Sequence, residues 1–187
     1  MSQSMTVPEI NTVCYIGAGT MGCYNAMAAA VSGYQVVLLA AQQESLDRVP
    51  QLQQEMAAML VGGGYCTEAD IEQALARTRI TADLVDATTN VDMVSESVFE
   101  DITLKRQVHT QLDECCPPHT LLTSNSSHLL VSDIEGVVKR GDRFADDVEG
   151  QVVDLAKANT RLSDVESLPR RAVRGLERLS RFYVRVD

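Results

Sequence analysis

The sequence predicts an α/β fold in which helices cover a doubly wound, mainly parallel sheet. Apolar strand-like runs alternate with helical segments over the first three-quarters of the 187 residues, which is the pattern of a parallel sheet wrapped by helices. A glycine-rich turn joins the first expected strand to the first expected helix. The length of 187 residues is enough for one ordinary domain and a short appendage, and the hydrophobic content of 45% is that of a globular protein.

The chain opens with two strand–helix pairs. Thr12–Ile16 and Gln35–Ala40 are short apolar runs, so each is expected to form a buried strand. Small residues predict a helix over Thr20–Val31, and an amphipathic pattern predicts a longer helix over Glu44–Leu60. Gly62–Gly64 ends the second helix, because glycine commonly follows the last helical residue.

A capping sequence starts the third expected helix. Thr67 is the expected N-cap, and Asp70 completes something close to a capping box for a helix that runs to Ala76. A short strand over Arg79–Thr81 follows.

Two further strand–helix pairs complete this part of the chain. Val91–Ser95 and Thr120–Thr123 have the apolar character of buried strands. Helices are expected over Asp101–Glu114 and over Asp133–Val138, the second with Ser132 as its cap.

Residues 147–187 differ in charge from the rest of the chain. Eight of the 16 basic residues lie there, and seven of these eight are arginine. We therefore expect a boundary between a domain over 1–146 and an Arg-rich helical tail over 147–187. The expected tail elements are helices over Val148–Asn159 and Arg170–Arg181 and a strand-like run over Phe182–Val186.

Charge and cysteine content argue against several functions. The net charge of −10 disfavours nucleic acid and anionic membranes as partners, and no segment resembles a transmembrane span or a secretory signal. The five cysteines contain no C-x-x-C pair, and the three histidines are scattered. We therefore expect free thiols, a cytoplasmic location and no metal site.

The glycine-rich turn has the G-x-G-x-x-G pattern of a dinucleotide-binding fold of the Rossmann type. Gly17 allows the tight turn, Gly19 lets the backbone approach a pyrophosphate, and Gly22 lets the helix pack closely on the strand. The N–H groups at the start of that helix would face the phosphates. The candidate cofactor-binding residues are Gly17, Ala18, Gly19, Thr20, Met21 and Gly22.

Two polar segments follow later strands, at the sheet edge where ligands bind in open α/β folds. The first is Ser95–Asp101, followed by Lys105, and the second is Ser124–Ser127. Taken separately, Glu100 and Lys105 could be a solvated pair at a helix start, and the serines an ordinary turn.

Taken together, the three motifs resemble the nucleotide-binding domain of the 3-hydroxyacyl-CoA dehydrogenases. The family's G-A-G-x-M-G turn matches Gly17–Gly22. Its E-x-x-x-E-x-x-x-x-K segment matches Glu96, Glu100 and Lys105. Its S-N-T-S-S segment matches Ser124–Ser127, with serine for threonine and a histidine in the last place. The resemblance covers roughly residues 11–146.

The resemblance implies an NAD-binding oxidoreductase domain. Glu100 and Lys105 would contact the ribose and nicotinamide side of NAD. Ser127 would touch both the nicotinamide and the substrate oxygen, and Asn125 would help shape that pocket, so these two are the catalytic candidates. The implied reaction is hydride transfer between NAD and a 3-hydroxyacyl-CoA in fatty-acid β-oxidation.

Three departures from the family pattern suggest a truncated member. Ala40 stands where an acidic residue should hold the adenine ribose. Arg48 is the single basic residue in Gln42–Leu60, where the family binds the CoA phosphates. The family's catalytic histidine segment and its helical second domain have no counterpart, since no histidine follows His128.

The histidines that are present are weak replacements for the missing base. His128 is next to Ser127 and is the single candidate near the expected crevice. His109 lies on a charged helix and is expected to be solvated, and His119 is expected in a loop.

Three interpretations therefore remain open. The leading one is an NAD-binding oxidoreductase domain, catalytically incomplete as an isolated chain, with an acyl-CoA substrate and with a partner chain or a homo-oligomer as the expected assembly. The alternatives are a non-catalytic NAD-binding or scaffold protein whose Arg-rich tail docks an acidic partner, and a related Rossmann hydroxy-acid dehydrogenase.

Overall fold

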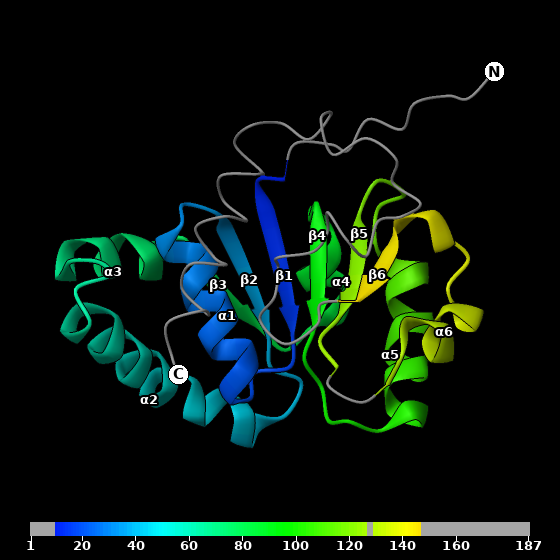
Figure 1. Cartoon of the computed structure of the whole chain (residues 1–187), viewed down its shortest axis with the longest axis horizontal. Helices are drawn as coiled ribbons and strands as arrows, with labels where there is room; N and C mark the ends of the chain where they lie inside the picture. Colours follow the sequence, from blue (N-terminus) through cyan, green and yellow to red (C-terminus); the bar gives the residue numbers. More distant parts are fainter. Residues whose placement is uncertain (1–9, 127–128, 147–187) are drawn as a thin grey trace.

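A parallel six-stranded sheet forms the centre of the molecule (Figure 1). The computed structural model describes residues 10–126 and 129–146, so the tail predicted over 147–187 lies outside the described residues. The strands run in the order β3-β2-β1-β4-β5-β6, and every pairing between neighbours is parallel. Their bounds are β1 Thr12–Ile16, β2 Gln35–Leu39, β3 Thr78–Thr81, β4 Met93–Glu96, β5 Leu121–Ser124 and β6 Phe144–Asp146.

The strand order changes direction between β1 and β4. The chain proceeds from β1 outward to β2 and β3, then returns to place β4 on the other side of β1. In open α/β sheets, ligands bind at this switch point, beyond the carboxyl ends of the strands. The topology therefore places the residues that follow β1, β4 and β5 at one edge.

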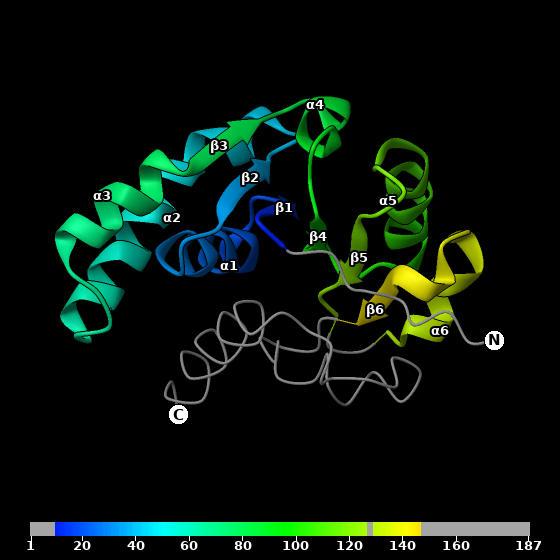
Figure 2. The same cartoon turned by 90° about the horizontal axis from the view of Figure 1, so that it is seen from above.

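Helices cover both faces of the sheet (Figure 2). One apolar core lies between the sheet and the first three helices, and a second core lies between the sheet and the later helices. The first group is α1 Thr20–Val31, α2 Gln43–Gly62 and α3 Glu68–Ala76. The second group is α4 Leu84–Thr88, α5 Ile102–Cys115, α6 Val131–Ile134 and the 3-10 turn Glu135–Val137, and a further 3-10 turn, Gly141–Arg143, precedes β6.

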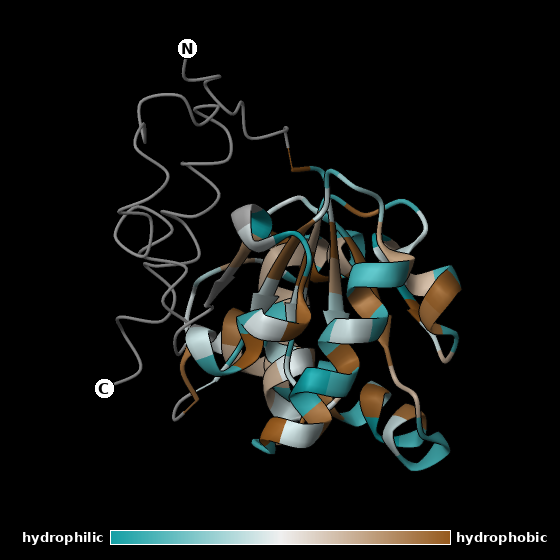
Figure 3. Cartoon of the chain, turned by 90° about the vertical axis from the view of Figure 1, so that its right-hand side faces the viewer, coloured by the Kyte–Doolittle hydropathy of each residue, from teal (hydrophilic) through white to brown (hydrophobic). Residues whose placement is uncertain are grey.

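Alternate residues of β1 supply the two cores. Val13 and Tyr15 join the core beneath α1, and Cys14 and Ile16 join the opposite core. Because both faces are covered, the strand is apolar throughout instead of alternating with polar residues. Figure 3 shows hydrophobic colouring over much of the length of the central strands.

Most elements lie where the sequence predicted them. The capping box at the start of α3 is confirmed, since Asp70 accepts a hydrogen bond from the Thr67 backbone and donates its own N–H to the Thr67 side chain. The prediction for 133–138 was wrong: α6 begins at Val131, before the expected cap Ser132, and gives way to a 3-10 turn after Ile134. Two elements were not predicted, α4 and β6, because five and three residues are too short to show a periodic pattern.

The cysteines are all free thiols, as expected. Burial raises the pKa of Cys14 and of Cys116 to about 12, so neither is a ready thiolate nucleophile. Within the described part of the chain, no helix is long and apolar enough to cross a membrane.

Arg140 ties the segment before β6 to the end of α5. Its Nε donates to Asp113 Oδ1 at 2.9 Å, and its other nitrogens donate to the carbonyl oxygens of Asp113 and Pro117, both at 2.6 Å. Burial alone would raise the pKa of Asp113, but the bonds from Arg140 and the Lys139 backbone lower it more.

Replacing Arg140 by glutamine should therefore destabilise the fold by about 2–3 kcal/mol. The buried Asp113 carboxylate and the carbonyl oxygens of Asp113, Cys116 and Pro117 would lose charged donors. Urea unfolding followed by circular dichroism measures this change. Arg79→Gln is the matched control, since the Arg79–Asp86 pair is about half exposed and should contribute little. Equal losses of unfolding free energy in Arg140→Gln and Arg79→Gln would contradict the prediction that the contacts of Arg140 stabilise the fold more than the exposed Arg79–Asp86 pair does.

Candidate functional site

The turn between β1 and α1 needs glycine at two positions. Gly17 has a φ of 104°, and a Cβ there would lie 2.7 Å from the carbonyl oxygen of Ser97, just after β4. A Cβ at Gly22 would lie 1.8 Å from the carbonyl oxygen of Gly17. Neither approach is possible for a larger residue, so these glycines bring α1 against the ends of β1 and β4.

Gly19 occupies a different environment, because a Cβ there would meet no atom within 4 Å. The residue is the N-cap of α1, no side chain caps this helix, and its first turn holds no acidic residue. The first N–H groups of a helix lack partners within the helix and attract anions. The open space at Gly19 and this uncapped terminus fit a pyrophosphate.

The end of β2 lacks a group that would bind the adenine ribose. Ala40 follows the strand directly, is fully buried and donates its backbone N–H to Thr81 at 3.0 Å. A methyl side chain cannot accept a hydrogen bond from a ribose hydroxyl. The residues present therefore fit the phosphates of a dinucleotide and leave one ribose contact missing.

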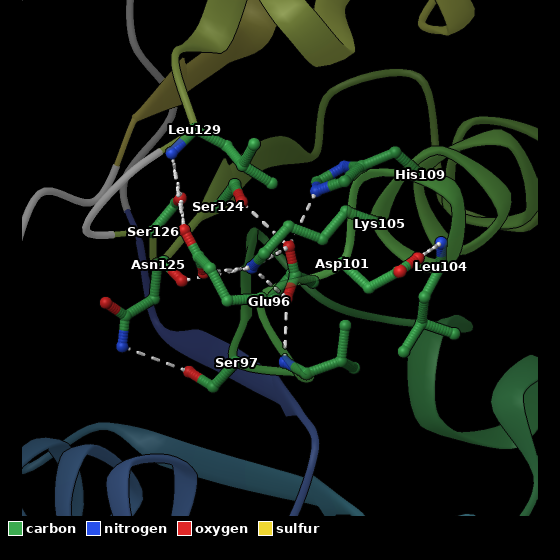
Figure 4. Close-up of polar contacts among 12 residues, drawn as sticks. Glu96, Ser97, Asp101, Leu104, Lys105, His109, Ser124, Asn125, Ser126 and Leu129 are labelled. Atoms are coloured by element: carbon green, nitrogen blue, oxygen red, sulfur yellow. Dashed lines mark hydrogen bonds and ion pairs between the residues drawn. The ribbon is translucent and has the colours of Figure 1, made fainter.

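Glu96, the last residue of β4, lies at the centre of a buried polar cluster (Figure 4). Its carboxylate accepts from Lys105 Nζ at 2.9 and 3.1 Å and from Ser124 Oγ at 2.7 Å. It also accepts from the Val98 backbone N–H at 2.7 Å, and His109 Nε2 lies 3.3 Å away. The side chains of Glu96, Lys105 and His109 have no exposed surface.

The surroundings of Glu96 favour its ionised form. Burial alone would raise the pKa of this carboxyl. The hydrogen bonds from His109, Lys105 and Ser124, together with the charge of Lys105, outweigh burial and hold the pKa below its ordinary value. A buried ion pair therefore lies just beneath the carboxyl edge of the sheet.

Glu100 and Asn125 both contact Lys105, the cation of this ion pair. Glu100 accepts hydrogen bonds from the Ser126 hydroxyl and the Leu129 backbone, and its carboxylate is 3.6 Å from Lys105 Nζ. The carbonyl oxygen of Asn125 accepts from Lys105 Nζ at 3.1 Å. The Asn125 side chain donates to Ser97 Oγ at 3.3 Å, so the turn after β5 contacts the segment that packs on Gly17.

The structure thus brings together most of the predicted site residues. Glu100, Lys105 and Asn125 form one contacting group, which rules out a solvated position for Lys105. Ser127 and His128 lie outside the described residues.

The expectation that His109 is solvated was wrong, because its side chain is fully buried against Glu96 and Phe144. The helical spacing of Lys105, His109 and Leu112, which share the buried face of α5, was the available signal.

The amino edge of the sheet has a separate hollow of about 500 Å³. It lies among the starts of β2 and β3 and the end of α4, away from the residues described above. Residues 10–126 and 129–146 contain no group of three or more histidine, cysteine or acidic side chains placed to hold a metal ion.

Comparisons with known proteins agree with this geometry. Residues 12–146 match the family profile described as the NAD binding domain of 3-hydroxyacyl-CoA dehydrogenase. A 3-hydroxyadipyl-CoA dehydrogenase of Escherichia coli is 35% identical over 137 residues, which cover 73% of this chain and 29% of the relative. A probable 3-hydroxybutyryl-CoA dehydrogenase of Bacillus subtilis is 31% identical, covering 72% of this chain and 47% of the relative.

Solved structures show the same relationship. A 3-hydroxybutyryl-CoA dehydrogenase from E. coli matches with a TM-score of 0.68 and 33% identity, over 74% of this chain and 29% of that one. A diketoreductase matches with a TM-score of 0.78 and 27% identity, over 92% of this chain and 62% of that one. The chain thus spans less than half the length of the curated relatives described above. The chain belongs to the 3-hydroxyacyl-CoA dehydrogenase family and corresponds to its NAD-binding domain.

Proposed function

We propose that the turn Gly17–Gly22 and the group formed by Glu100, Lys105 and Asn125 bind NAD in an oxidoreductase acting on 3-hydroxyacyl-CoA thioesters. The observation that carries the proposal is the open, uncapped helix terminus at Gly19, which lies at the same sheet edge as the buried Glu96–Lys105 pair. We assign residues 1–146 to this domain and residues 147–187 to an Arg-rich arm.

Each group of residues has a separate role in this proposal. The N–H groups of α1 bind the pyrophosphate, and Gly17, Ala18, Gly19, Thr20, Met21 and Gly22 form that part of the site. Glu100 and Lys105 orient the ribose and nicotinamide side, Asn125 shapes the pocket, and Ser127 orients the substrate oxygen. NAD, when bound, supplies the hydride acceptor.

Titrating the purified chain with NADH, with nicotinamide fluorescence as the signal, tests the proposal. Saturable binding is expected. No saturable change up to millimolar cofactor would overturn it and would favour the non-catalytic scaffold, for which Ala40 is the supporting observation.

Introducing an acidic residue at Ala40 should tighten NADH binding by about tenfold, because a carboxylate would accept hydrogen bonds from the adenine ribose. Fluorescence titration of Ala40→Asp against the wild type measures the gain. Ala41→Asp adds the same charge one residue later, at an exposed position, and should not reproduce it. Unchanged affinity in Ala40→Asp would argue against a ribose at this strand end.

The isolated chain should not oxidise NADH in the presence of acetoacetyl-CoA. The general base of the family has no matching position, since no histidine follows His128. We propose that a partner chain supplies the missing base. Sustained absorbance loss at the NADH band would contradict this expectation, and its disappearance in His128→Ala would then identify the base.

We also propose a cytoplasmic location, which the five free thiols support because the cytosol keeps thiols reduced. Relatives from rat and rapeseed carry mitochondrial and glyoxysomal names. Cell fractionation with an antibody to this chain distinguishes these compartments.

A further inference from the structure

Glu96 is a buried carboxylate to which the proposed function assigns no role of its own. It is the last residue of β4, and its side chain has no exposed surface, so it cannot touch a bound cofactor. A buried ion pair is often no more stabilising than well-packed apolar residues of similar volume. The stability of the fold therefore does not by itself account for a carboxylate at this position, and its contacts point to another role.

The first set of contacts holds the loop that follows β4. Glu96 Oε1 accepts the backbone N–H of Val98 at 2.7 Å, which fixes the backbone of this loop two residues after the strand. The loop continues to Glu100, whose carboxylate lies 3.6 Å from Lys105 Nζ. Lys105 is itself paired with Glu96 at 2.9 Å. Glu96 therefore holds the loop that carries Glu100 at two points.

The second set of contacts holds the turn that follows β5. Ser124 Oγ donates to Glu96 Oε2 at 2.7 Å, and the Asn125 backbone N–H donates to the Glu96 carbonyl oxygen at 2.7 Å. Lys105 Nζ, which is paired with the Glu96 carboxylate, also donates to the Asn125 carbonyl oxygen at 3.1 Å. Figure 4 shows the Glu96 carboxylate at the centre of these contacts, with dashed lines that run toward both loops.

The glycine turn is held by different bonds. The Ser97 backbone N–H donates to the Ile16 carbonyl oxygen at 2.8 Å, and the Gly17 N–H donates to the Leu39 carbonyl oxygen at 3.1 Å. These are backbone bonds between strand ends, and a change in the Glu96 side chain leaves them in place. The two halves of the expected dinucleotide site are therefore supported separately.

We propose that Glu96 is a positioning residue whose carboxylate fixes the relative position of Glu100 and Asn125, and thereby the binding of the nicotinamide half of the dinucleotide. The half that binds at Gly17–Gly22 does not depend on it. Contact groups bind well when buried neighbours lock their geometry. The inference rests on the proposed function, because it needs the second ribose and the nicotinamide near Glu100 and Asn125.

Glutamine at this position tests the proposal with little change in volume. The carboxylate accepts from Val98 through one oxygen and from Ser124 through the other. An amide has one acceptor oxygen, and its NH2 group only donates, so in Glu96→Gln one of the two loops loses its acceptor.

The measurement compares NADH with ADP by titration calorimetry. ADP carries the adenine, one ribose and the pyrophosphate but lacks the second ribose and the nicotinamide. In Glu96→Gln the Kd of NADH should rise about tenfold relative to the wild type, while the Kd of ADP should change less than about twofold. A general loss of stability would not move the ratio of the two Kd values.

Two further variants on β5 separate the position of the loops from the loss of a buried hydroxyl. Ser124→Ala removes a donor to Glu96 and should raise the Kd of NADH about threefold, with the Kd of ADP unchanged. Thr123→Val is the matched control, because the Thr123 hydroxyl is also buried but donates to the Val94 carbonyl oxygen at 3.0 Å. It should keep the wild-type ratio. Thermal unfolding identifies any loss of fold, and Ser124→Ala provides the reading if Glu96→Gln is unstable.

The possible failures are distinguishable. A wild-type ratio of the two Kd values in both Glu96→Gln and Ser124→Ala overturns the role of Glu96 and leaves dinucleotide binding intact. An equal loss of NADH and ADP affinity in Glu96→Gln, or the same change of ratio in Thr123→Val, also overturns it, because damage to the strands would then be sufficient. Absence of NADH binding by the wild type overturns both proposals.

Discussion

Alanine at Gly22 should both destabilise the fold and abolish dinucleotide binding, whereas alanine at Gly19 should abolish binding alone. At Gly22 the new Cβ would lie 1.8 Å from the Gly17 carbonyl oxygen, a backbone atom that cannot move without displacing α1 from β1. Overpacking of this kind costs about 3 kcal/mol. At Gly19 the Cβ meets no protein atom, so it would occupy only the space proposed for the pyrophosphate.

Urea unfolding and NADH titration of the same preparations separate the two effects. Gly136→Ala is the matched control, because a Cβ there also meets nothing within 4 Å and the residue lies in the 3-10 turn after α6. It should leave both stability and binding near the wild-type values. Normal NADH affinity in Gly19→Ala would show that the phosphates do not lie at the α1 terminus.

Gly19 and Gly22 show how much of the fold and of the site could be predicted from the sequence. The strand, turn and helix over residues 12–31 are contiguous, so a local pattern was sufficient to predict them and to predict close packing at Gly22. The converging strand ends were predictable from parallel topology, which places Ser97 and Asn125 at one edge. The hydrogen bond between the two side chains depends on the packing of the folded chain, and the sequence pattern did not predict it.

The polar cluster shows what the sequence could not provide. Glu96, Glu100 and Lys105 were found through a motif, but a motif does not show that Lys105 is fully buried. His109 was misjudged because its helix is rich in charged residues, while it is buried against Phe144, 35 positions away on a strand of three residues. Strand β6 is too short to show a sequence pattern, yet it carries the ring that packs against His109. The surroundings of His109 could therefore not be predicted from the sequence.

Replacing Lys105 by methionine should be among the most destabilising changes in the described part of the chain. Methionine preserves much of the apolar volume of lysine but leaves the Glu96 carboxylate buried without its cation. Breaking a buried ion pair from one side costs about 3–5 kcal/mol. Urea unfolding at neutral pH measures the loss, and Lys139→Met, at an exposed lysine, should cause little change.

The pH dependence gives a second test of the same pair. The folded protein holds the pKa of Glu96 below its ordinary value, so this group stabilises the wild type at neutral pH and loses that effect as the pH falls through the lowered pKa. In Lys105→Met the ammonium is gone, burial weighs more heavily, and a proton on Glu96 becomes favourable. The destabilisation by Lys105→Met should therefore shrink as the pH is lowered.

Glu96→Gln on the Lys105→Met background provides the decisive comparison at neutral pH. A neutral amide removes the uncompensated charge, so the double variant should be more stable than Lys105→Met although it carries one more substitution. Neither variant should bind NADH normally, because the proposed ribose contact of Lys105 is absent from both. A double variant as unstable as the sum of the two single changes would mean that the pair is not energetically coupled, and that Lys105 stabilises the fold through packing alone.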